Sequence, residues 1–280
     1  MECNLKNLKI YYEIYGEGHP VLMIHGFAPD HRLMKGCMEP IFKNRDKYKR
    51  IYFDLPGMGK TTAPKWIKNS DQILDVVLEF IDKVIPNENF IIASESYGCY
   101  LARGVLLKRF KFVDAVLFIC PLIIPLTENR DLPKDFKVLI KDNAFISSLS
   151  ASDAVELESS LVIQSRDVWE RFEKEVFSGL KIVDQKFLEK IFPANYEFSF
   201  EVDNLLQLYE KPTLFLLGRQ DISVGYRDAW KIIENYPNAT FAILDQAGHN
   251  LQIEKAELFN SLVNDWLDRV EYGRSSLNND

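Results

Sequence analysis

The five residues SESYG, residues 94–98, have the composition of a sharp turn that presents a serine nucleophile. They lie between an apolar, strand-like run at 90–93 and a segment with helical spacing that begins at Tyr97. In a G-x-S-x-G turn the positions two before and two after the serine must be small, because the strand and helix backbones nearly touch there. Gly98 meets this requirement, and Ser94 stands where glycine is expected. Ser96 is therefore a candidate nucleophile, although the pentapeptide alone also fits a helix-capping or turn serine.

A serine hydroxyl needs a base to take its proton and an acid to orient that base. Asp221 follows the predicted strand 213–217, and His249 follows the predicted strand 240–244, so both are expected on loops at the carboxyl ends of strands. Each fits a structural role when it is taken singly, as a capping aspartate or a surface-loop histidine. Together with Ser96 they occur in the chain order of a Ser-Asp-His catalytic triad, which favours one site. Asp245 is an alternative acid, but it is too close in sequence to His249 to lie behind the ring.

Acyl transfer also needs hydrogen-bond donors for the oxyanion that forms on the substrate. Gly26 follows the predicted buried strand 21–24, and a glycine allows the backbone to turn an N–H group toward the site. We predict the backbone N–H groups of Phe27 and Tyr97 as the two donors. The His25 side chain, in the same turn, is expected to be structural.

The stretch FDLPGMGKTTAP, residues 53–64, offers a competing hypothesis, a phosphate-binding loop ending in Gly59-Lys60-Thr61. Such a loop needs a glycine five positions before the glycine of this triplet, so that the backbone can wrap the phosphates. Asp54 occupies that position, and its carboxylate would repel a triphosphate. The stretch fits a glycine-rich turn after a strand better than it fits a nucleotide site.

Strand-like and helix-like segments alternate along the chain, which is typical of a mostly parallel sheet covered by helices. Strands are predicted at 9–15, 21–24, 50–53, 90–93, 115–119, 213–217 and 240–244. Helices are predicted at 71–85, 97–108, 226–235 and 251–270, followed by a polar, frayed tail from 273 to 280. From 121 to 208 the sequence is rich in charged residues and helix formers and lacks continuous strand-like runs. This segment is predicted to be a helical insertion.

Together these motifs resemble the α/β-hydrolase fold superfamily over nearly the whole chain. The resemblance is carried by His25-Gly26, the D-x-x-G-x-G turn at 54–59, the Ser96 turn, Gly218-Arg219-Gln220-Asp221 and Gly248-His249. It implies a core domain formed by residues 1–120 and 209–280, and a helical cap at 121–208 that shapes the substrate pocket. Aromatic cap residues could line that pocket, although at helical spacing they more often only pack together: Phe145, Trp169, Phe172, Phe177 and Phe192.

The composition of the chain argues against several other classes of function. With 47% hydrophobic residues, the 280-residue chain can bury a large core, and its formal net charge of −7 opposes a nucleic-acid partner. No signal-peptide core or membrane-spanning run is found, so a cytoplasmic location is expected. The four cysteines lie far apart and the four histidines form no metal-binding pair, so neither a metal nor a cofactor is predicted. The oligomeric state cannot be read from the sequence.

These features predict a serine hydrolase that cleaves a small to medium acyl ester through an acyl-enzyme intermediate. A serine at position 96 argues against relatives that attack with an aspartate. A peptidase, a lactonase and a C–C bond hydrolase remain alternatives on the same fold, as do a lyase and a ligand receptor with little turnover. Accumulation of an acyl-enzyme would separate the hydrolases from the last two.

Overall fold

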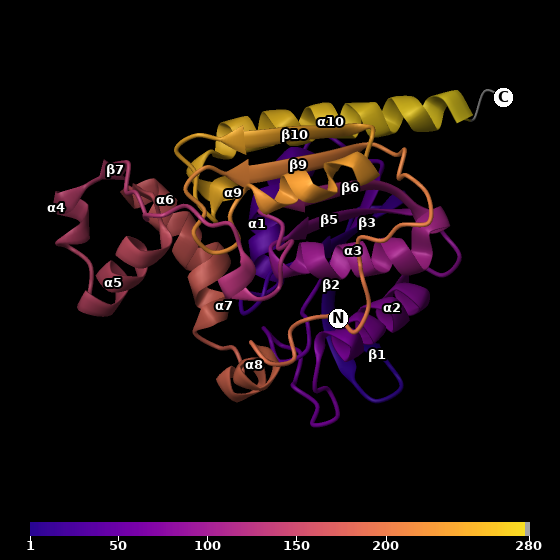
Figure 1. The fold of residues 1–280 in the computed structure, drawn as a ribbon, viewed down its shortest axis with the longest axis horizontal. Helices are drawn as coiled ribbons and strands as arrows, with labels where there is room; N and C mark the ends of the chain where they lie inside the picture. Colours follow the sequence, from indigo (N-terminus) through magenta and orange to yellow (C-terminus); the bar gives the residue numbers. More distant parts are fainter. Residues whose placement is uncertain (278–280) are drawn as a thin grey trace.

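The computed structural model describes residues 1–277 and contains a central sheet of eight strands in the order β1-β2-β4-β3-β5-β6-β9-β10 (Figure 1). The strands are β1 (Glu2–Asn4), β2 (Lys9–Tyr15), β3 (His19–Ile24), β4 (Tyr48–Phe53), β5 (Phe90–Glu95), β6 (Val113–Ile119), β9 (Thr213–Gly218) and β10 (Ala239–Leu244). β2 pairs antiparallel with β1 and β4, and all other neighbours in this sheet are parallel. The predicted fold class, a mostly parallel sheet flanked by helices, is confirmed.

The inner strands are apolar because helices cover both faces of the sheet. Every residue of β3, β5 and β9 is buried, which is the pattern of strands packed on both sides. In the pairing register, Ile24 of β3 lies opposite Ser94 of β5, and Glu95 lies opposite Ile119 of β6. The carboxyl ends of these strands therefore meet at one edge of the sheet, where the loops that follow them converge.

The flanking helices are α1 (His31–Phe42), α2 (Ser70–Val84), α3 (Tyr97–Arg109) and α10 (Ala256–Leu277). α1 contacts α10 and packs on β3 and β4, whereas α2 contacts α3, which packs on β3, β5 and β6 (Figure 1). The first turns of α1 and α2 are capped by the side chains of Asp30 and Asn69, each of which accepts a backbone N–H. The two helix pairs thus form the outer layers that bury the sheet.

The segment between β6 and β9 projects from one side of the sheet, where α4, α5 and β7 lie farthest from it in Figure 1. It contains α4 (Asn143–Ile146), α5 (Ala151–Ser160), α6 (Arg166–Phe172), a π-helical turn (Glu173–Phe177), α7 (Ser178–Leu180) and α8 (Gln185–Ile191). It also contains a two-stranded sheet of β7 (Ile140–Lys141) and β8 (Ile163–Gln164), which the sequence did not indicate. Two-residue strands are too short to produce an alternating pattern in the sequence.

Two predicted helices near the C-terminus need correction. The segment predicted as a helix at 226–235 instead forms 3-10 turns over Asp228–Asn235, the tighter helical form that often serves in connections. The helix predicted at 251–270 is divided into α9 (Leu251–Glu254) and α10, since Lys255 adopts a non-helical conformation with ψ of 46°. α10 also continues to Leu277 through most of the tail predicted to be frayed, and 278–280 lie outside the described residues.

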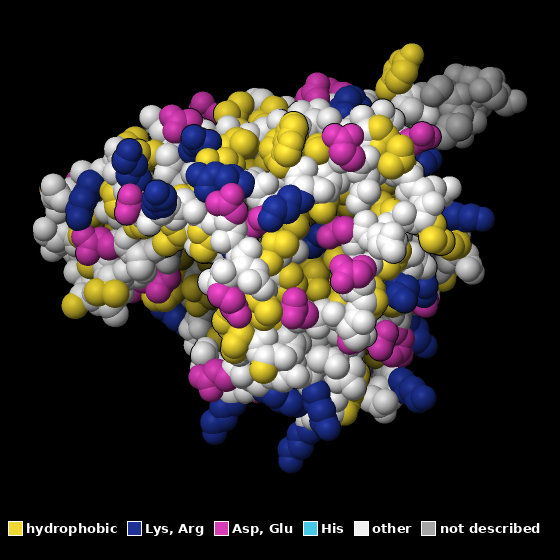
Figure 2. Space-filling model, in the orientation of Figure 1, with side chains coloured by type: hydrophobic (Ala, Val, Ile, Leu, Met, Phe, Trp, Pro, Cys, Tyr) yellow, Lys and Arg dark blue, Asp and Glu magenta, His cyan; other side chains and the backbone are white. Residues whose placement is uncertain are grey.

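Acidic and basic side chains are interspersed over the face of the molecule shown in Figure 2, with hydrophobic side chains scattered between them. Within residues 1–277, no helix combines the length and the apolar composition needed to cross a membrane.

Candidate active site

Ser96 lies in the turn between β5 and α3 with a φ of +51°, a value that residues other than glycine seldom adopt. Its N–H donates to Ile119 O at 2.9 Å, which helps to hold this conformation. At Gly98, a Cβ atom would collide with the carbonyl groups of Ile24, the last residue of β3, and of His25, which follows it. The sequence requirement for a small residue two positions after the serine therefore follows from the close approach of α3 to β3.

Ser94, which stands where the G-x-S-x-G pattern has glycine, is accommodated by the neighbouring strand. Its hydroxyl is fully buried, donates to Leu117 O at 3.1 Å and lies 3.4 Å from Cys99 Sγ. The serine side chain therefore has a hydrogen-bond partner and enough space, so the turn forms without the glycine.

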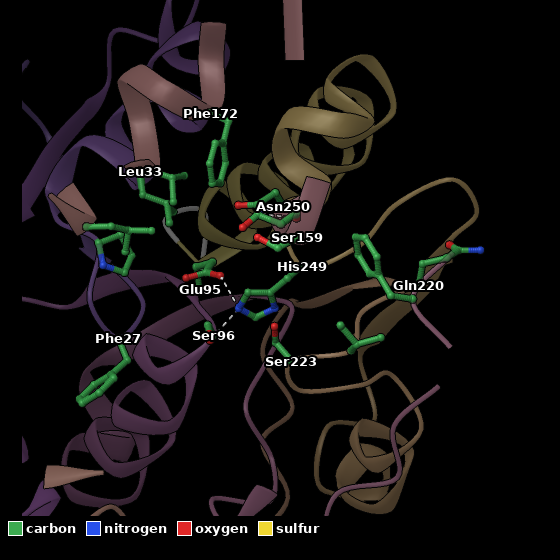
Figure 3. A pocket seen from close by; sticks show the side chains of 16 residues that line it. Phe27, Leu33, Glu95, Ser96, Ser159, Phe172, Gln220, Ser223, His249 and Asn250 are labelled. Atoms are coloured by element: carbon green, nitrogen blue, oxygen red, sulfur yellow. Dashed lines mark hydrogen bonds and ion pairs between the residues drawn. The ribbon is translucent and has the colours of Figure 1, made fainter. Parts of the chain in front are cut away.

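The structure brings Ser96, His249 and Asp221 together at the carboxyl edge of the sheet. Ser96 Oγ lies 3.0 Å from His249 Nε2 (Figure 3). On the other side of the ring, His249 Nδ1 lies 2.8 Å from Asp221 Oδ2. The three residues follow β5, β10 and β9, so parallel strands that end at one edge position them. This arrangement can pass a proton from the hydroxyl to the imidazole and hold the ring in one tautomer.

Asp221 is fully buried and its carboxylate is well satisfied. Oδ1 accepts the N–H groups of Ser223 at 2.8 Å and Val224 at 3.0 Å, while Oδ2 contacts His249. Burial alone would raise the pKa of Asp221, but the nearby His249 and these hydrogen bonds lower it below its usual value. Asp245, the alternative acid, is exposed, and Asp221 is the residue that contacts the imidazole Nδ1.

The charge state of His249 responds to the same contacts. Burial favours the neutral ring, but the Asp221 carboxylate and its hydrogen bond, assisted by Glu95, raise the pKa of His249 to about 9. A carboxylate behind Nδ1 stabilises the imidazolium that forms when the ring takes a proton.

The predicted oxyanion donors, Phe27 and Tyr97, flank Ser96. Their rings contact each other edge to face, with centroids 5.3 Å apart, and a Cβ at Gly26 would lie 3.3 Å from Ser96 Cβ. Within the described part of the chain, no residue accepts a backbone hydrogen bond from either N–H. This is compatible with the predicted role of both groups as oxyanion donors.

The His25 side chain is fully buried and supports the turn that carries Phe27. Its Nε2 lies 3.0 Å from the N–H of Leu55, and its Nδ1 lies 2.8 Å from Gly26 O. A neutral ring that donates from Nδ1 and accepts at Nε2 satisfies both contacts, and burial lowers the pKa of His25 accordingly. The ring thereby ties this turn to the turn after β4.

In the glycine-rich turn after β4, the backbone packs around the carboxylate of Asp54. Asp54 Oδ1 accepts the N–H of His31 at 2.9 Å and Oδ2 accepts the N–H of Lys60 at 2.8 Å. A Cβ at Gly59 would collide with this carboxyl group. The Asp54 carboxylate thus already accepts the N–H of Lys60 in this turn, and its charge would repel a phosphate.

A cavity of about 230 Å³ opens next to Ser96 and His249 (Figure 3). It is lined by Phe27, Pro29, Leu33, Glu95, Ser96, Phe136, Ser159, Ser160, Phe172, Val176, Leu180, Gln220, Ile222, Ser223, His249 and Asn250. Of the five aromatic residues considered from the sequence, Phe172 lines this cavity, while Trp169 and Phe177 pack against Phe172. Phe192 packs instead against Phe27.

One residue of the site was missed by the sequence analysis. Glu95 Oε1 lies 3.3 Å from His249 Nε2, and the Glu95 side chain is only 3% exposed (Figure 3). Burial raises the pKa of this carboxyl to about 7, although the positive charge of His249 opposes the rise. Its position directly before the candidate nucleophile was the available signal, but the G-x-S-x-G pattern leaves that position unspecified.

Among the described residues, two groups bring potential metal ligands together: Cys120, Asp221 and His249, and Asp30, His31 and Asp54. Asp221 and His249 bond to each other, and so do His31 Nδ1 and Asp54 Oδ1 at 2.7 Å. Because these atoms already serve as one another's partners, we assign no metal role to either group.

Comparison with known proteins defines the class. The alpha/beta hydrolase fold family matches residues 19–256, so the chain belongs to this family and is a hydrolase of that fold. A crystal structure of an alpha/beta superfamily hydrolase from Oenococcus oeni PSU-1 is similar with a TM-score of 0.86 and 28% identity, and the match covers 97% of this chain and 99% of that one.

Curated relatives are more distant in sequence. A pimeloyl-[acyl-carrier protein] methyl ester esterase from Legionella pneumophila (strain Corby) is 22% identical over 93% of this chain and 100% of its own length. A proline iminopeptidase from Xylella fastidiosa (strain 9a5c) is 24% identical over 89% of each chain. Different reactions are thus named among proteins of similar length, so the bond that this chain cleaves has to be argued from its own site.

Proposed function

We propose that this protein is a serine hydrolase that cleaves small to medium acyl esters through an acyl-enzyme intermediate. The observation that carries the proposal is the unbroken hydrogen-bond chain from Ser96 Oγ through the His249 ring to Asp221, at 3.0 and 2.8 Å. It lies beside a cavity of about 230 Å³, which suits a small acyl group.

In the proposed mechanism, Ser96 Oγ attacks the ester carbonyl while His249 Nε2 accepts the hydroxyl proton. The N–H groups of Phe27 and Tyr97 stabilise the oxyanion, and losing one such donor typically costs about 3 kcal/mol of transition-state stabilisation. His249 then gives its proton to the leaving alcohol and activates water to release the acid. Asp221 holds the ring tautomer and stabilises its positive charge throughout.

We further propose that residues 121–208 act as the cap of the pocket and that residues 1–120 and 209–280 form the core. Phe172 and Val176, from the segment between β6 and β9, contribute to the cavity wall. Residues of α1, of the end of β5 and of the loops after β3, β5, β9 and β10 complete it. The length and shape of the acyl group accepted would therefore depend on this segment.

The proposal is tested by hydrolysis of p-nitrophenyl esters of increasing acyl length, with wild type and Ser96→Ala measured in parallel. Ser96-dependent steady-state turnover with an optimum at short to medium acyl chains is expected. A stoichiometric burst without turnover would instead indicate a receptor-like protein. Hydrolysis that is undiminished in Ser96→Ala would refute Ser96 as the nucleophile.

A further inference from the structure

Glu95 shares the reacting face of His249 with the candidate nucleophile. Its Oε1 lies 3.3 Å from His249 Nε2, the same nitrogen that Ser96 Oγ approaches at 3.0 Å (Figure 3). A substrate carbonyl attacked by Ser96 must lie about 3 Å from that hydroxyl oxygen. The bound ester is therefore a near neighbour of the Glu95 carboxyl.

The Glu95 carboxyl is fixed in this position by the backbone around it. A Cβ atom at Gly26 would collide with Glu95 Oε2, so the carboxyl occupies the space beside the turn that carries the Phe27 N–H. Because its side chain is 3% exposed, water screens it weakly, and its charge acts strongly on neighbouring groups.

Among the described residues that line the cavity, His249 is the one that can carry a positive charge. None of the described residues that line it is a lysine or an arginine, and Glu95 is the one carboxylic acid among them. Arg130 lies outside the lining, and its guanidinium donates to the backbone oxygens of Ile124, Pro125 and Ser223. Glu95 is thus the lining side chain that can place a negative charge beside the reacting atoms.

We propose that Glu95 is a specificity-determining residue that makes the site accept esters with an uncharged acyl group and reject those with a carboxylate close to the scissile carbonyl. This inference rests on the proposed ester hydrolysis at Ser96. A second carboxylate brought within a few ångströms of Glu95 in a poorly screened cavity is repelled, which is selection by an unfavourable contact with the wrong substrate. An uncharged group of the same shape meets no such repulsion.

Glu95 repels a carboxylate only when it is ionised, and its ionisation depends on the titratable groups around it. The charged groups that act on it are His249 and Asp221, from the loops after β10 and β9. The other titratable groups near it, all with a raised pKa caused mainly by burial and hence neutral at physiological pH, are Cys37, Cys99, Cys120 and Tyr196. Discrimination should therefore strengthen as the pH rises through the pKa of Glu95, near 7.

The test compares two methyl esters of the same shape, monomethyl succinate, which is an anion above pH 6, and methyl succinamate, which is neutral. The kcat/KM for each is measured at pH 8 from the methanol released, with wild type, Glu95→Gln and Ser96→Ala. Wild type should prefer the neutral ester, and Glu95→Gln, which keeps the shape and removes the charge, should reduce this preference by roughly tenfold. The exposed Glu257→Gln on α10 removes an equal charge far from the cavity and should leave the preference unchanged.

If Glu95→Gln does not fold, the wild-type preference measured from pH 6 to pH 8.5 replaces it. Both esters are attacked only by enzyme with a neutral His249, so the fraction of neutral His249 cancels in the ratio of the two kcat/KM values. A preference that rises with pH supports the proposal, and one that is constant overturns it. An unchanged preference in folded Glu95→Gln, with turnover still dependent on Ser96, overturns the role of Glu95 and leaves the esterase proposal standing. Failure of wild type to hydrolyse the neutral ester and the p-nitrophenyl esters overturns the proposed function itself.

Discussion

Glu254 accepts the backbone N–H of Gly248, the residue before His249, with Oε2 at 2.6 Å. Its other oxygen, Oε1, accepts the N–H of Val162 at 2.7 Å, in the segment between β6 and β9. The almost fully buried carboxyl group thus joins the loop of the candidate base to a segment that contributes to the cavity wall. Asn250 Nδ2 adds a parallel connection to Ser160 O at 3.2 Å.

We expect Glu254→Gln to lower both stability and turnover. A glutamine side chain presents one acceptor oxygen and an amide that cannot accept, so the N–H of Gly248 or that of Val162 loses its partner. A buried donor left unsatisfied costs about 1–3 kcal/mol. Thermal unfolding followed by circular dichroism should report this loss, and kcat should fall because the His249 loop is less well held. Glu257→Gln, at an exposed position on α10, is the matched control, and an equal Tm for both variants would contradict the bridging role.

Substitution of the candidate catalytic residues should distinguish their proposed roles. Ser96→Ala is expected to abolish turnover, and Asp221→Asn should lower kcat by about a thousandfold or more, because the amide no longer stabilises the required tautomer and charge of His249. Steady-state kinetics with the best p-nitrophenyl ester measures both effects. Asp245→Asn, which changes the exposed alternative acid, should remain within a few-fold of wild type. Near-normal activity in Asp221→Asn would rule out Asp221 as the orienting acid.

The pH dependence should reflect the raised pKa of His249. The free enzyme needs a neutral imidazole to accept the serine proton, so kcat/KM should fall as the pH drops below about 9. Glu95→Gln removes a negative charge that favours the imidazolium, which lowers the pKa of His249 and moves this acid limb to lower pH. A pH profile of kcat/KM for a neutral ester checks both statements. A limb that moves to higher pH in Glu95→Gln would contradict the electrostatic contact.

Positions 94 and 98, which hold small residues on either side of Ser96, should differ in how well they tolerate substitution. Gly98→Ala places a Cβ against the carbonyls of Ile24 and His25, so we expect a large loss of stability and of activity as the turn is displaced. Ser94→Gly removes one hydrogen bond, to Leu117 O, and should cost about 1 kcal/mol with activity retained. Chemical denaturation and ester hydrolysis measured on both variants test this contrast. Wild-type stability in Gly98→Ala would mean that α3 and β3 are not so closely packed.

Phe172 should limit the acyl length that fits. It is almost fully buried and lines the cavity, so Phe172→Leu removes part of the wall with a smaller loss of packing than a change to alanine. The chain-length optimum for p-nitrophenyl esters should shift to longer acyl groups. Trp169→Leu, at a residue that packs behind Phe172, is the control for lost aromatic packing without a change in the lining. An unmoved optimum in Phe172→Leu would show that another part of the wall sets the limit.

The sequence by itself determined the alternation of strands and helices and the order of the chemically active residues. Apolar runs such as 90–93 predict buried strands because the side chains of a strand covered on both faces are apolar throughout. Small residues around Ser96 allow the sharp turn between β5 and α3. The parallel topology brings the carboxyl ends of the strands to one edge of the sheet. The family and the fold class inferred from these patterns are confirmed, and the structure places Ser96, Asp221 and His249 within hydrogen-bond distance, while their roles remain to be tested.

Only the tertiary structure decided the contacts that depend on how distant segments meet. The short strands of the inserted segment, the break at Lys255 and the bridge from Glu254 to Val162 leave no periodic signal, because each depends on a few contacts and not on a repeated side-chain pattern. The position of Glu95 against His249 likewise follows from the meeting of two loops 153 residues apart at Ser96 and His249. Local propensity determines which elements form, whereas the charge and shape of the pocket arise from side chains that only the folded chain brings together.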